Sequence, residues 1–326
     1  MHKKITRRAF CSMLLALPFP ARAQQTGRIF RIGILVAASP SIQSARVEAF
    51  RRRLRELGYV EGKNIVVDYR SAEGKLDWLP GLAAELVRLK VDVIVTIGVG
   101  VLAAKKATST IPIVFAFSGD PVGTGLVSSL ARPGGNLTGL SLMAPDLDGK
   151  RLELLKEAFP KFARVAFLWG SGGPRGNSAL TDMEAAAREL RLKLLSLEVR
   201  RLEDFDSAFA RAKRDRAQGL ITAANPLIDN QRRQVLDFAA KNRLPAMHAS
   251  SEFVDAGGLM SYAPNYMDLW RRAADFVDKI LKGTKPEDIP VEQPMRFEFI
   301  VNLIAAKQIG VTIPPNVLVR ANRVIR

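Results

Sequence analysis

The chain has 326 residues, of which 48% are hydrophobic and 25% charged, and its formal net charge is +17. This length exceeds one typical domain, so we expect two, and the composition is that of a globular protein. The sequence holds one cysteine, Cys11, and two histidines, His2 and His248. These counts argue against disulfide frameworks, cysteine nucleophiles and clusters of histidine ligands, which need more of these residues than the chain supplies.

The first two dozen residues have the pattern of a bacterial export signal. Four basic residues between positions 3 and 8 precede an apolar run at 9–17, and the small-residue pattern Ala21-Arg22-Ala23 follows. The apolar run is too short to span a bilayer, and this order of regions is typical of a signal peptide that is cleaved near Ala23. We therefore expect residues 1–23 to be removed and the protein to be periplasmic.

Two details of this leader affect the interpretation. Thr6-Arg7-Arg8-Ala9-Phe10 resembles a twin-arginine signal, which exports folded cargo, and a Sec signal with two adjacent arginines remains the alternative. Cys11 lies at the start of the apolar run, away from the cleavage site, which argues against a lipid anchor. The leader carries five basic and no acidic residues, so its removal leaves +12 of the formal +17 and one histidine, His248.

The basic residues do not predict a nucleic-acid partner. Arginine pairs such as Arg200-Arg201 and Arg232-Arg233 are spread over many expected helix faces. We find no basic strand interleaved with aromatic residues and no helix-turn-helix segment. We interpret the excess charge as solvated helix surface, which favours solubility and attracts anions over long range.

The first half of the chain alternates between short apolar strands and amphipathic helices. The segment 31–36 is apolar throughout after Arg31, which is typical of a strand buried on both faces of a parallel sheet. The helix expected at 42–57 keeps helical spacing of its apolar residues and ends at Gly58. Further strands are expected at 64–69, 91–96, 113–117 and 137–142, and further helices at 76–89, 100–108 and 125–131.

The same alternation restarts in the second half. Because strand–helix–strand crossovers are right-handed and produce parallel sheets, we expect an α/β fold of two Rossmann-like lobes with a cleft between them. Helices are expected at 149–159, 177–190, 202–214, 227–242, 250–255, 266–282 and 303–308, and strands at 164–169, 193–199, 219–222, 245–248, 259–262 and 295–301.

The C-terminal elements must be shared between the lobes. We expect the chain to cross the cleft near Ala144, near Ala263 and near Lys285, and Pro314-Pro315 to form a rigid stop. The expected division is a signal peptide at 1–23, lobe 1 at 28–143 plus 264–284, and lobe 2 at 144–263 plus 285–326.

The loops that follow the expected strands are rich in small polar residues. Ligands bind at such loops in α/β sheets, because strand C-termini and helix N-termini converge there and free backbone N–H groups favour anions. Each loop alone also fits a tight turn or a helix cap. Five of them at equivalent positions of two lobes favour a shared site. They lie at 38–41, 97–100, 118–123, 170–174 and 223–226.

Neither glycine-rich loop fits a nucleotide site. Gly98-x-Gly100 lacks the third glycine of a dinucleotide fingerprint, and the glycines at 170–173 are not followed by Lys-Ser or Lys-Thr. With one histidine and no cysteine left after the leader, a metal site is not expected either. The sequence therefore predicts no cofactor and no metal.

The segment SGDPVGTGLVSSLARPGGNLTG at 118–139 resembles the signature of a family of ABC-transporter substrate-binding proteins, the bacterial group with tryptophan- and phenylalanine-binding members. Residues 32–35, 54–59 and 305–315 are similar too, so the match runs from about Arg31 to Arg326. The resemblance implies a type I periplasmic-binding-protein fold with three hinge strands and a ligand closed between the lobes. It also implies a monomer that delivers a small molecule to an ABC permease, without chemistry on the ligand.

The ligand itself stays open. Amino acids, small peptides, aromatic acids and other anionic metabolites all fit the resemblance, and we expect an amino acid or another small carboxylate. Carried over position by position, the implied site has a first wall of Ser39, Val99, Gly100, Ser118, Asp120 and Pro121, a second wall of Ser171, Asn225 and His248, and Tyr262 near the hinge.

Several of these residues have a second interpretation. Asp120 either accepts a hydrogen bond from a ligand ammonium or caps the following turn. His248 either faces the cleft or is a packed core histidine. Phe117 and Trp169 either stack on a ring of the ligand or fill the core.

Two other functions remain alternatives. One is a sensor subunit that presents its ligand-bound shape to a membrane receptor, and genes for a permease and an ATPase beside this one would argue against it. The other is an exported enzyme on the same fold, for which Asp120 and His248 are the candidate acid–base pair. A transcriptional regulator is disfavoured, because a leader occupies the place of a DNA-binding segment.

Overall fold

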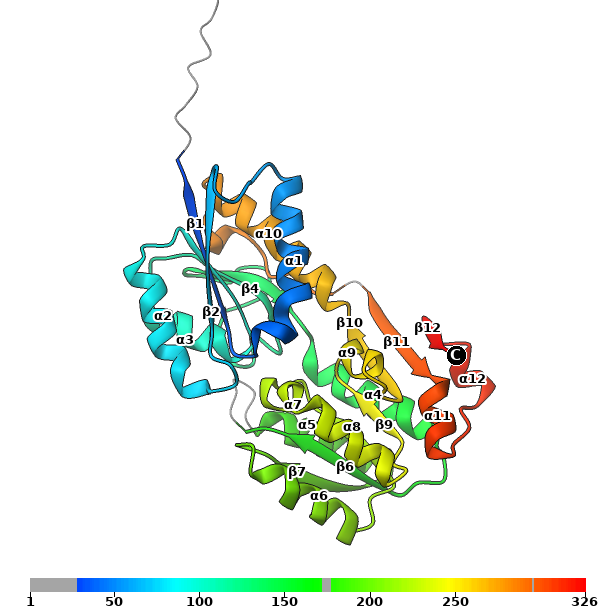
Figure 1. The fold of residues 1–326 in the computed structure, drawn as a ribbon. Coiled ribbons are helices and arrows are strands. Elements are labelled where there is room, and N and C mark those ends of the chain that lie inside the picture. The colour runs from blue at the N-terminus through cyan, green and yellow to red at the C-terminus, as the bar shows by residue number, and fades with distance from the viewer. Residues whose placement is uncertain (1–27, 172–176, 295) are drawn as a thin grey trace, which may run out of the picture.

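In the computed structural model, which describes residues 28–171, 177–294 and 296–326, the chain forms two α/β lobes stacked along the long axis of the molecule (Figure 1). The export signal expected at 1–23 lies outside these residues. Within the described ranges, no helix combines the length and the apolar character needed to cross a bilayer.

The first lobe is built on a five-stranded parallel sheet of order β2-β1-β3-β4-β5. All five residues of its central strand β3 are buried, as expected for a strand covered on both faces. Its strands are β1 (Phe30–Val36), β2 (Ile65–Ser71), β3 (Val93–Ile97), β4 (Ile113–Ser118) and β5 (Leu137–Ser141).

Helices cover both faces of this sheet. On one face α1 and α10 pack together over the strands, where the rings of Phe50 and Trp270 meet edge to face with centroids 6.1 Å apart. On the other face α2 and α3 bury Leu86 and Val101 against the sheet. The helices are α1 (Pro40–Glu56), α2 (Leu79–Arg88), α3 (Val99–Ala107) and α10 (Tyr266–Leu281), with short 3₁₀ turns η1 (Leu76–Trp78) and η2 (Pro286–Asp288).

The second lobe is built on a seven-stranded sheet of order β12-β11-β10-β9-β8-β6-β7, parallel except between β10 and β11. The strands are β6 (Arg164–Trp169), β7 (Lys193–Glu198), β8 (Gly219–Thr222), β9 (Ala246–His248), β10 (Met260–Pro264), β11 (Phe297–Asn302) and β12 (Arg323–Ile325).

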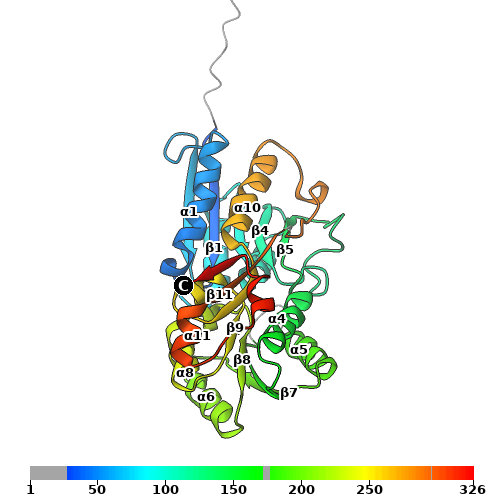
Figure 2. The ribbon, with the colours of Figure 1, turned by 90° about the vertical axis from the view of Figure 1, so that its right-hand side faces the viewer.

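Helices also cover both faces of the second sheet, with α4 and α5 on one side and α6 and α8 on the other (Figure 2). The helices of this lobe are α4 (Ala144–Ala158), α5 (Ser178–Glu189), α6 (Asp204–Arg214), α7 (Pro226–Asn230), α8 (Arg232–Lys241), α9 (Ser251–Asp255), α11 (Leu303–Ile309) and α12 (Pro315–Leu318).

The chain passes between the lobes three times. It leaves the first sheet after β5 to form α4, and it leaves the second sheet after β10 to form α10. After α10 the backbone N–H groups of Val291 and Glu292 still donate to the carbonyls of Leu130 and Gly139 in the first lobe, at 2.7 and 3.0 Å. The chain then enters β11 of the second sheet.

Two expected helices differ in the structure. Residues 125–131 do not form a helix but lie within a long series of turns between β4 and β5, because Gly125, Gly134 and Gly135 take left-handed φ values of 67°, 74° and 64°. The helix expected at 227–242 is divided into α7 and α8, and the break falls at Gln231.

Candidate functional site

A cavity of about 130 Å³ lies between the two lobes. It is lined by the loops that follow β1, β3, β4 and β5 in the first lobe and β6, β8 and β9 in the second, so the carboxyl ends of both sheets meet there. This is the place where α/β sheets bind ligands. An apolar cavity of about 150 Å³ holds a benzene molecule, so the space suits one ring-sized group.

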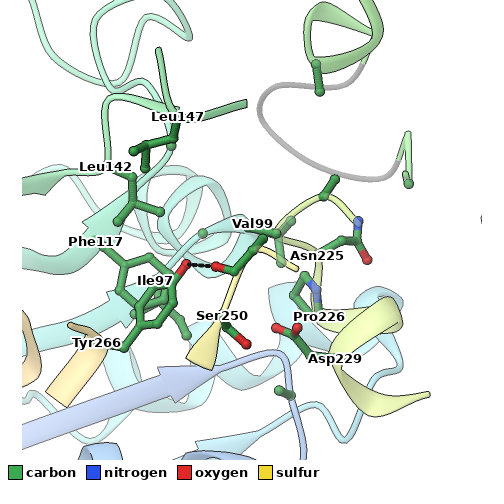
Figure 3. A pocket seen from close by; sticks show the side chains of 18 of the residues that line it. Ile97, Val99, Phe117, Leu142, Leu147, Asn225, Pro226, Asp229, Ser250 and Tyr266 are labelled. Atoms are coloured by element: carbon green, nitrogen blue, oxygen red, sulfur yellow. Dashed lines mark hydrogen bonds between the residues drawn. The ribbon is translucent and has the colours of Figure 1, made fainter. Parts of the chain in front are cut away.

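Three apolar side chains lie together at one end of the cavity. Phe117, Leu142 and Leu147 are there, away from Asn225 and Asp229 (Figure 3). Tyr266, from the first turn of α10, packs its ring against Phe117 with centroids 4.9 Å apart. Its hydroxyl donates to the carbonyl of Ala249 at 3.2 Å, and burial raises its pKa to about 12, so the hydroxyl remains a donor.

Asn225, Ser250 and Asp229 line the other end (Figure 3). The Asn225 side chain is held in place because its oxygen accepts a hydrogen bond from the N–H of Leu227 at 2.8 Å and so caps α7. Asp229 lies on the last turn of α7 and is partly buried, with part of its surface facing the cavity. Burial raises its pKa to about 6, although Arg46 acts in the opposite direction.

Arg46 joins the two lobes beside this polar end. It lies on α1, is only 2% exposed, and its Nε donates to Glu252 Oε1 on α9 at 2.9 Å. Its guanidinium also lies 4.5 Å from the centre of the Tyr266 ring, a cation–π distance. Burial alone would raise the pKa of Glu252, but Arg46 outweighs it and the pKa is lowered, so the pair is ionic.

A second buried ion pair lines the cavity from α4. Arg151 Nη1 donates to Asp148 Oδ1 at 2.7 Å, and both side chains are almost fully buried. Arg151 Nε also donates to the carbonyl of Tyr262 on β10 at 2.8 Å. The arginine therefore ties α4 to a strand that leads directly into the passage between the lobes.

Comparisons with known proteins place this arrangement in a family. A family model described as "ABC transporter substrate binding protein" matches residues 31–325. The chain belongs to this family. One curated relative is the "Tyrosine-binding protein" of Clostridioides difficile (strain R20291), which is 27% identical over 265 residues that cover 81% of this chain and 75% of the relative.

Two solved structures are informative about this substrate-binding protein. The ABC domain in complex with L-Trp from Streptococcus pneumoniae is 25% identical, covers 91% of this chain and 100% of that chain, and has a TM-score of 0.84. The ligand-free, open structure of a substrate binding protein with adhesive properties from Clostridium difficile is also 25% identical, covers 91% and 99%, and has a TM-score of 0.66. The expected type I periplasmic-binding-protein fold is confirmed.

Of the ten residues that the sequence implied for the site of this substrate-binding protein, Val99 and Asn225 line the cavity. The other eight are described residues outside its lining. Asp120 accepts a hydrogen bond from the N–H of Gly123 at 2.8 Å and so caps a turn. The eight are Ser39, Gly100, Ser118, Asp120, Pro121, Ser171, His248 and Tyr262.

His248 and Tyr262 have packed surroundings instead. His248 is fully buried, with Nδ1 3.2 Å from Thr222 Oγ1 and its ring stacked on Phe253 at 4.4 Å. The Tyr262 ring stacks on Phe297 with centroids 5.8 Å apart, and the carbonyl of Tyr262 accepts a hydrogen bond from Arg151. Phe117 and Trp169, for which the sequence left stacking or core filling open, both line the cavity and are also largely buried.

Sequence reasoning missed the polar residues that reach the cavity from helices. They lie in the first or second turn after a strand–helix loop, whereas our expectation concentrated on the loops themselves. A usable signal was present, because polar pairs spaced i, i+3 share one helix face. The missed helix residues are Gln43, Arg46, Asp148, Arg151, Asp229 and Tyr266. Ser250 was missed as well, although it lies in the loop directly after β9.

Proposed function

We propose that this protein is exported and acts, as a monomer, as the solute-binding component of an ABC importer. It captures an amino acid or another small carboxylate between its lobes, closes over the ligand by a hinge movement, and performs no chemistry on it. The observation that carries this proposal is the cavity lined by both lobes. A ligand held there touches both walls, so it favours the arrangement in which the lobes meet.

The two ends of the cavity suit the two ends of such a ligand. The apolar end, with Phe117 and Leu142, accommodates a ring or an aliphatic side chain. The polar end offers the Asn225 amide and the Ser250 hydroxyl, and Val99 at the N-terminus of α3 brings positive helix-dipole potential that favours a carboxylate.

The relatives support an amino acid ligand and a closing movement. The printed names describe one relative as tyrosine-binding and one solved structure as an L-Trp complex. The two solved structures are equally identical to this chain, yet its TM-score is 0.84 with the L-Trp complex and 0.66 with the open, ligand-free protein. This difference supports the view that the lobes lie here in a closed arrangement.

A thermal-shift screen of the purified protein tests ligand capture. We expect one or more amino acids or small aromatic acids to raise the melting temperature, because a ligand that binds only the native state stabilises it. Titration calorimetry then gives the affinity, and small-angle scattering with the best ligand should give a smaller radius of gyration. A panel of amino acids and small carboxylates without any effect would refute the proposal.

A matched pair of variants on α3 locates the site. Val99 lines the cavity, whereas Leu102 on the same helix is 40% exposed. Val99→Trp should fill the cavity and abolish binding, and Leu102→Trp, a comparable increase in size at the surface, should leave the affinity unchanged. Equal affinities for the two variants would show that the ligand binds elsewhere.

Cell fractionation tests export. We expect the protein in the periplasmic fraction, with a mass and an N-terminal sequence that begin near Gln24. Replacement of Arg7 and Arg8 together by lysine should block export if the twin-arginine route is used and leave it intact if the Sec route is used. An intact leader on a protein that stays in the cytosol would contradict the proposal.

A further inference from the structure

Among the described residues, the charged side chains that line the cavity are Arg46, Asp148, Arg151 and Asp229. Arg46 is paired with Glu252 across the lobes, and Arg151 is paired with Asp148 on the same helix. Within the described chain the Asp229 carboxylate has neither a hydrogen bond nor an ion pair. Of these four charged side chains, Asp229 is therefore the one without a direct partner of opposite charge.

Two arginines act on Asp229 through their charge, but within the described residues neither forms a hydrogen bond or an ion pair with its carboxylate. Arg46 faces it from α1 but already donates two hydrogen bonds to Glu252, so one guanidinium serves two carboxylates. Arg232 on α8 also lowers the pKa of Asp229 through its charge, while its guanidinium lies over the Phe253 ring, 5.4 Å from the centroid.

The remaining titratable groups around the polar end add no positive charge. Tyr266 from α10 keeps its proton, since burial raises its pKa to about 12. His248 on β9 is neutral, since burial lowers its pKa to about 3. The Asp148–Arg151 pair on α4 brings one charge of each sign.

We propose that Asp229 selects the charge of the ligand by receiving a positively charged nitrogen, such as a primary ammonium. The cavity then prefers ligands that carry this group over acids of the same shape that lack it. A ligand with its ring against Phe117 and its polar end near Asn225 brings an ammonium to Asp229 (Figure 3). An acid without the ammonium meets uncompensated repulsion there. This inference rests on the proposed function and narrows its ligand class.

The raised pKa of Asp229 agrees with this role. Burial shifts it to about 6, so in the ligand-free protein at neutral pH the carboxylate is ionised in surroundings that disfavour its charge. A carboxylate that serves ligand binding destabilises the ligand-free protein in this way, because the ligand supplies the positive charge that stabilises the carboxylate.

The first test compares three probes of matched shape by calorimetry at pH 7.5. L-phenylalanine carries an ammonium and a carboxylate, 3-phenylpropionate lacks the ammonium, and phenethylamine lacks the carboxylate. We expect the wild type to bind phenylalanine at least about 10-fold more tightly than phenylpropionate, since one unmatched charge is worth about one decade or more. Asp229→Asn should weaken the binding of phenylalanine about 30-fold or more, which is the loss of affinity that follows truncation of one partner of a buried charge pair.

Asp237→Asn is the matched control, because Asp237 is an exposed residue on α8 and the substitution is the same. It should leave all three affinities unchanged. Equal wild-type affinities for phenylalanine and phenylpropionate, or an Asp229→Asn variant that binds phenylalanine as the wild type does, would overturn the charge selection alone. Failure of all probes and of the wider panel to bind the wild type would instead overturn the proposed function.

The second test needs no ligand. If the Asp229 carboxylate is uncompensated, Asp229→Asn should raise the melting temperature at pH 7.5, and the gain should vanish near pH 4, where the wild-type carboxylate is protonated. The direction follows because a raised folded-state pKa removes stability as pH rises through about 6. A lower melting temperature at pH 7.5 would mean that Asp229 has a structural partner and would overturn the inference.

Discussion

His248 should make the stability of this protein depend on pH, with a loss of stability in acid. The ring is fully buried between Thr222 and Phe253, and burial, together with the charge of Arg232, lowers its pKa to about 3. In the unfolded chain a histidine titrates near 6.5. Between these two values the unfolded chain binds a proton that the folded protein does not, so the free energy of unfolding falls as the pH decreases below about 6.5.

The size of this effect follows from the two pKa values. Over the roughly two pH units between about 6.5 and 4.5, the unfolded state binds one proton more than the folded state. This difference lowers the free energy of unfolding by about 2.7 kcal/mol. That is a large part of the roughly 5–15 kcal/mol that stabilises a typical domain. Asp229 acts in the opposite direction, since its raised pKa adds stability as the pH falls through about 6. The wild-type profile alone therefore does not isolate His248.

Urea unfolding of the wild type and His248→Asn at pH 7.5, 5.5 and 4.5 isolates it. At pH 7.5 the variant should be less stable by about 1–2 kcal/mol, because it loses the stacking on Phe253 and leaves a small cavity. At pH 4.5 it should be the more stable protein. Thr222→Val removes the hydrogen bond but keeps the ring, so it should retain the wild-type pH dependence. Parallel pH profiles for the wild type and His248→Asn would refute the reasoning.

Two further substitutions probe backbone packing and the contact between the lobes. Gly139→Ala should cost about 3 kcal/mol in urea unfolding, because the added Cβ would lie 2.1 Å from the carbonyl oxygen of Phe115 at a φ of 151°; a loss below about 1 kcal/mol would contradict this geometry. Glu252→Gln removes the ion-pair partner of buried Arg46, so we expect a lower melting temperature and weaker ligand binding. Asp255→Asn, which affects an exposed ion pair, should change neither measurably, and equal effects of the two variants would contradict the role assigned to Glu252.

The fold was predictable from the sequence because its signals are local and repeated. Mostly apolar segments such as 31–36 and 91–96 give strands β1 and β3, which are buried along most or all of their length, and the helical periodicity between them sets the parallel topology. The prediction failed at 125–131, where the apolar spacing resembles a helix. There the left-handed glycines and the hydrogen bonds of the Asp120 turn determine the backbone instead.

The site was harder to predict, because the side chains that line the cavity are selected by how the two lobes meet. Val99 and Asn225 lie at helix starts that follow a strand, which is where ligand contacts are expected in an α/β sheet. Arg46 and Asp229 lie farther along their helices, and a single sequence does not tell whether such a side chain faces solvent or the other lobe. His248 illustrates the reverse case, since its strand ends at the expected edge but its ring turns into the core.

The way the lobes meet is compatible with the ligand-driven hinge movement proposed above. The buried apolar residues form separate clusters in the two lobes, and contacts between the lobes include single polar interactions: Arg46 with Glu252, Tyr266 with the carbonyl of Ala249, and the N–H of Ser39 with Asn230. In the hinge movement proposed above, water would replace such hydrogen bonds as the lobes separate, so each would contribute only about 1–3 kcal/mol. On that proposal the open and closed arrangements differ by a few kcal/mol, an amount that a ligand contacting both walls can supply.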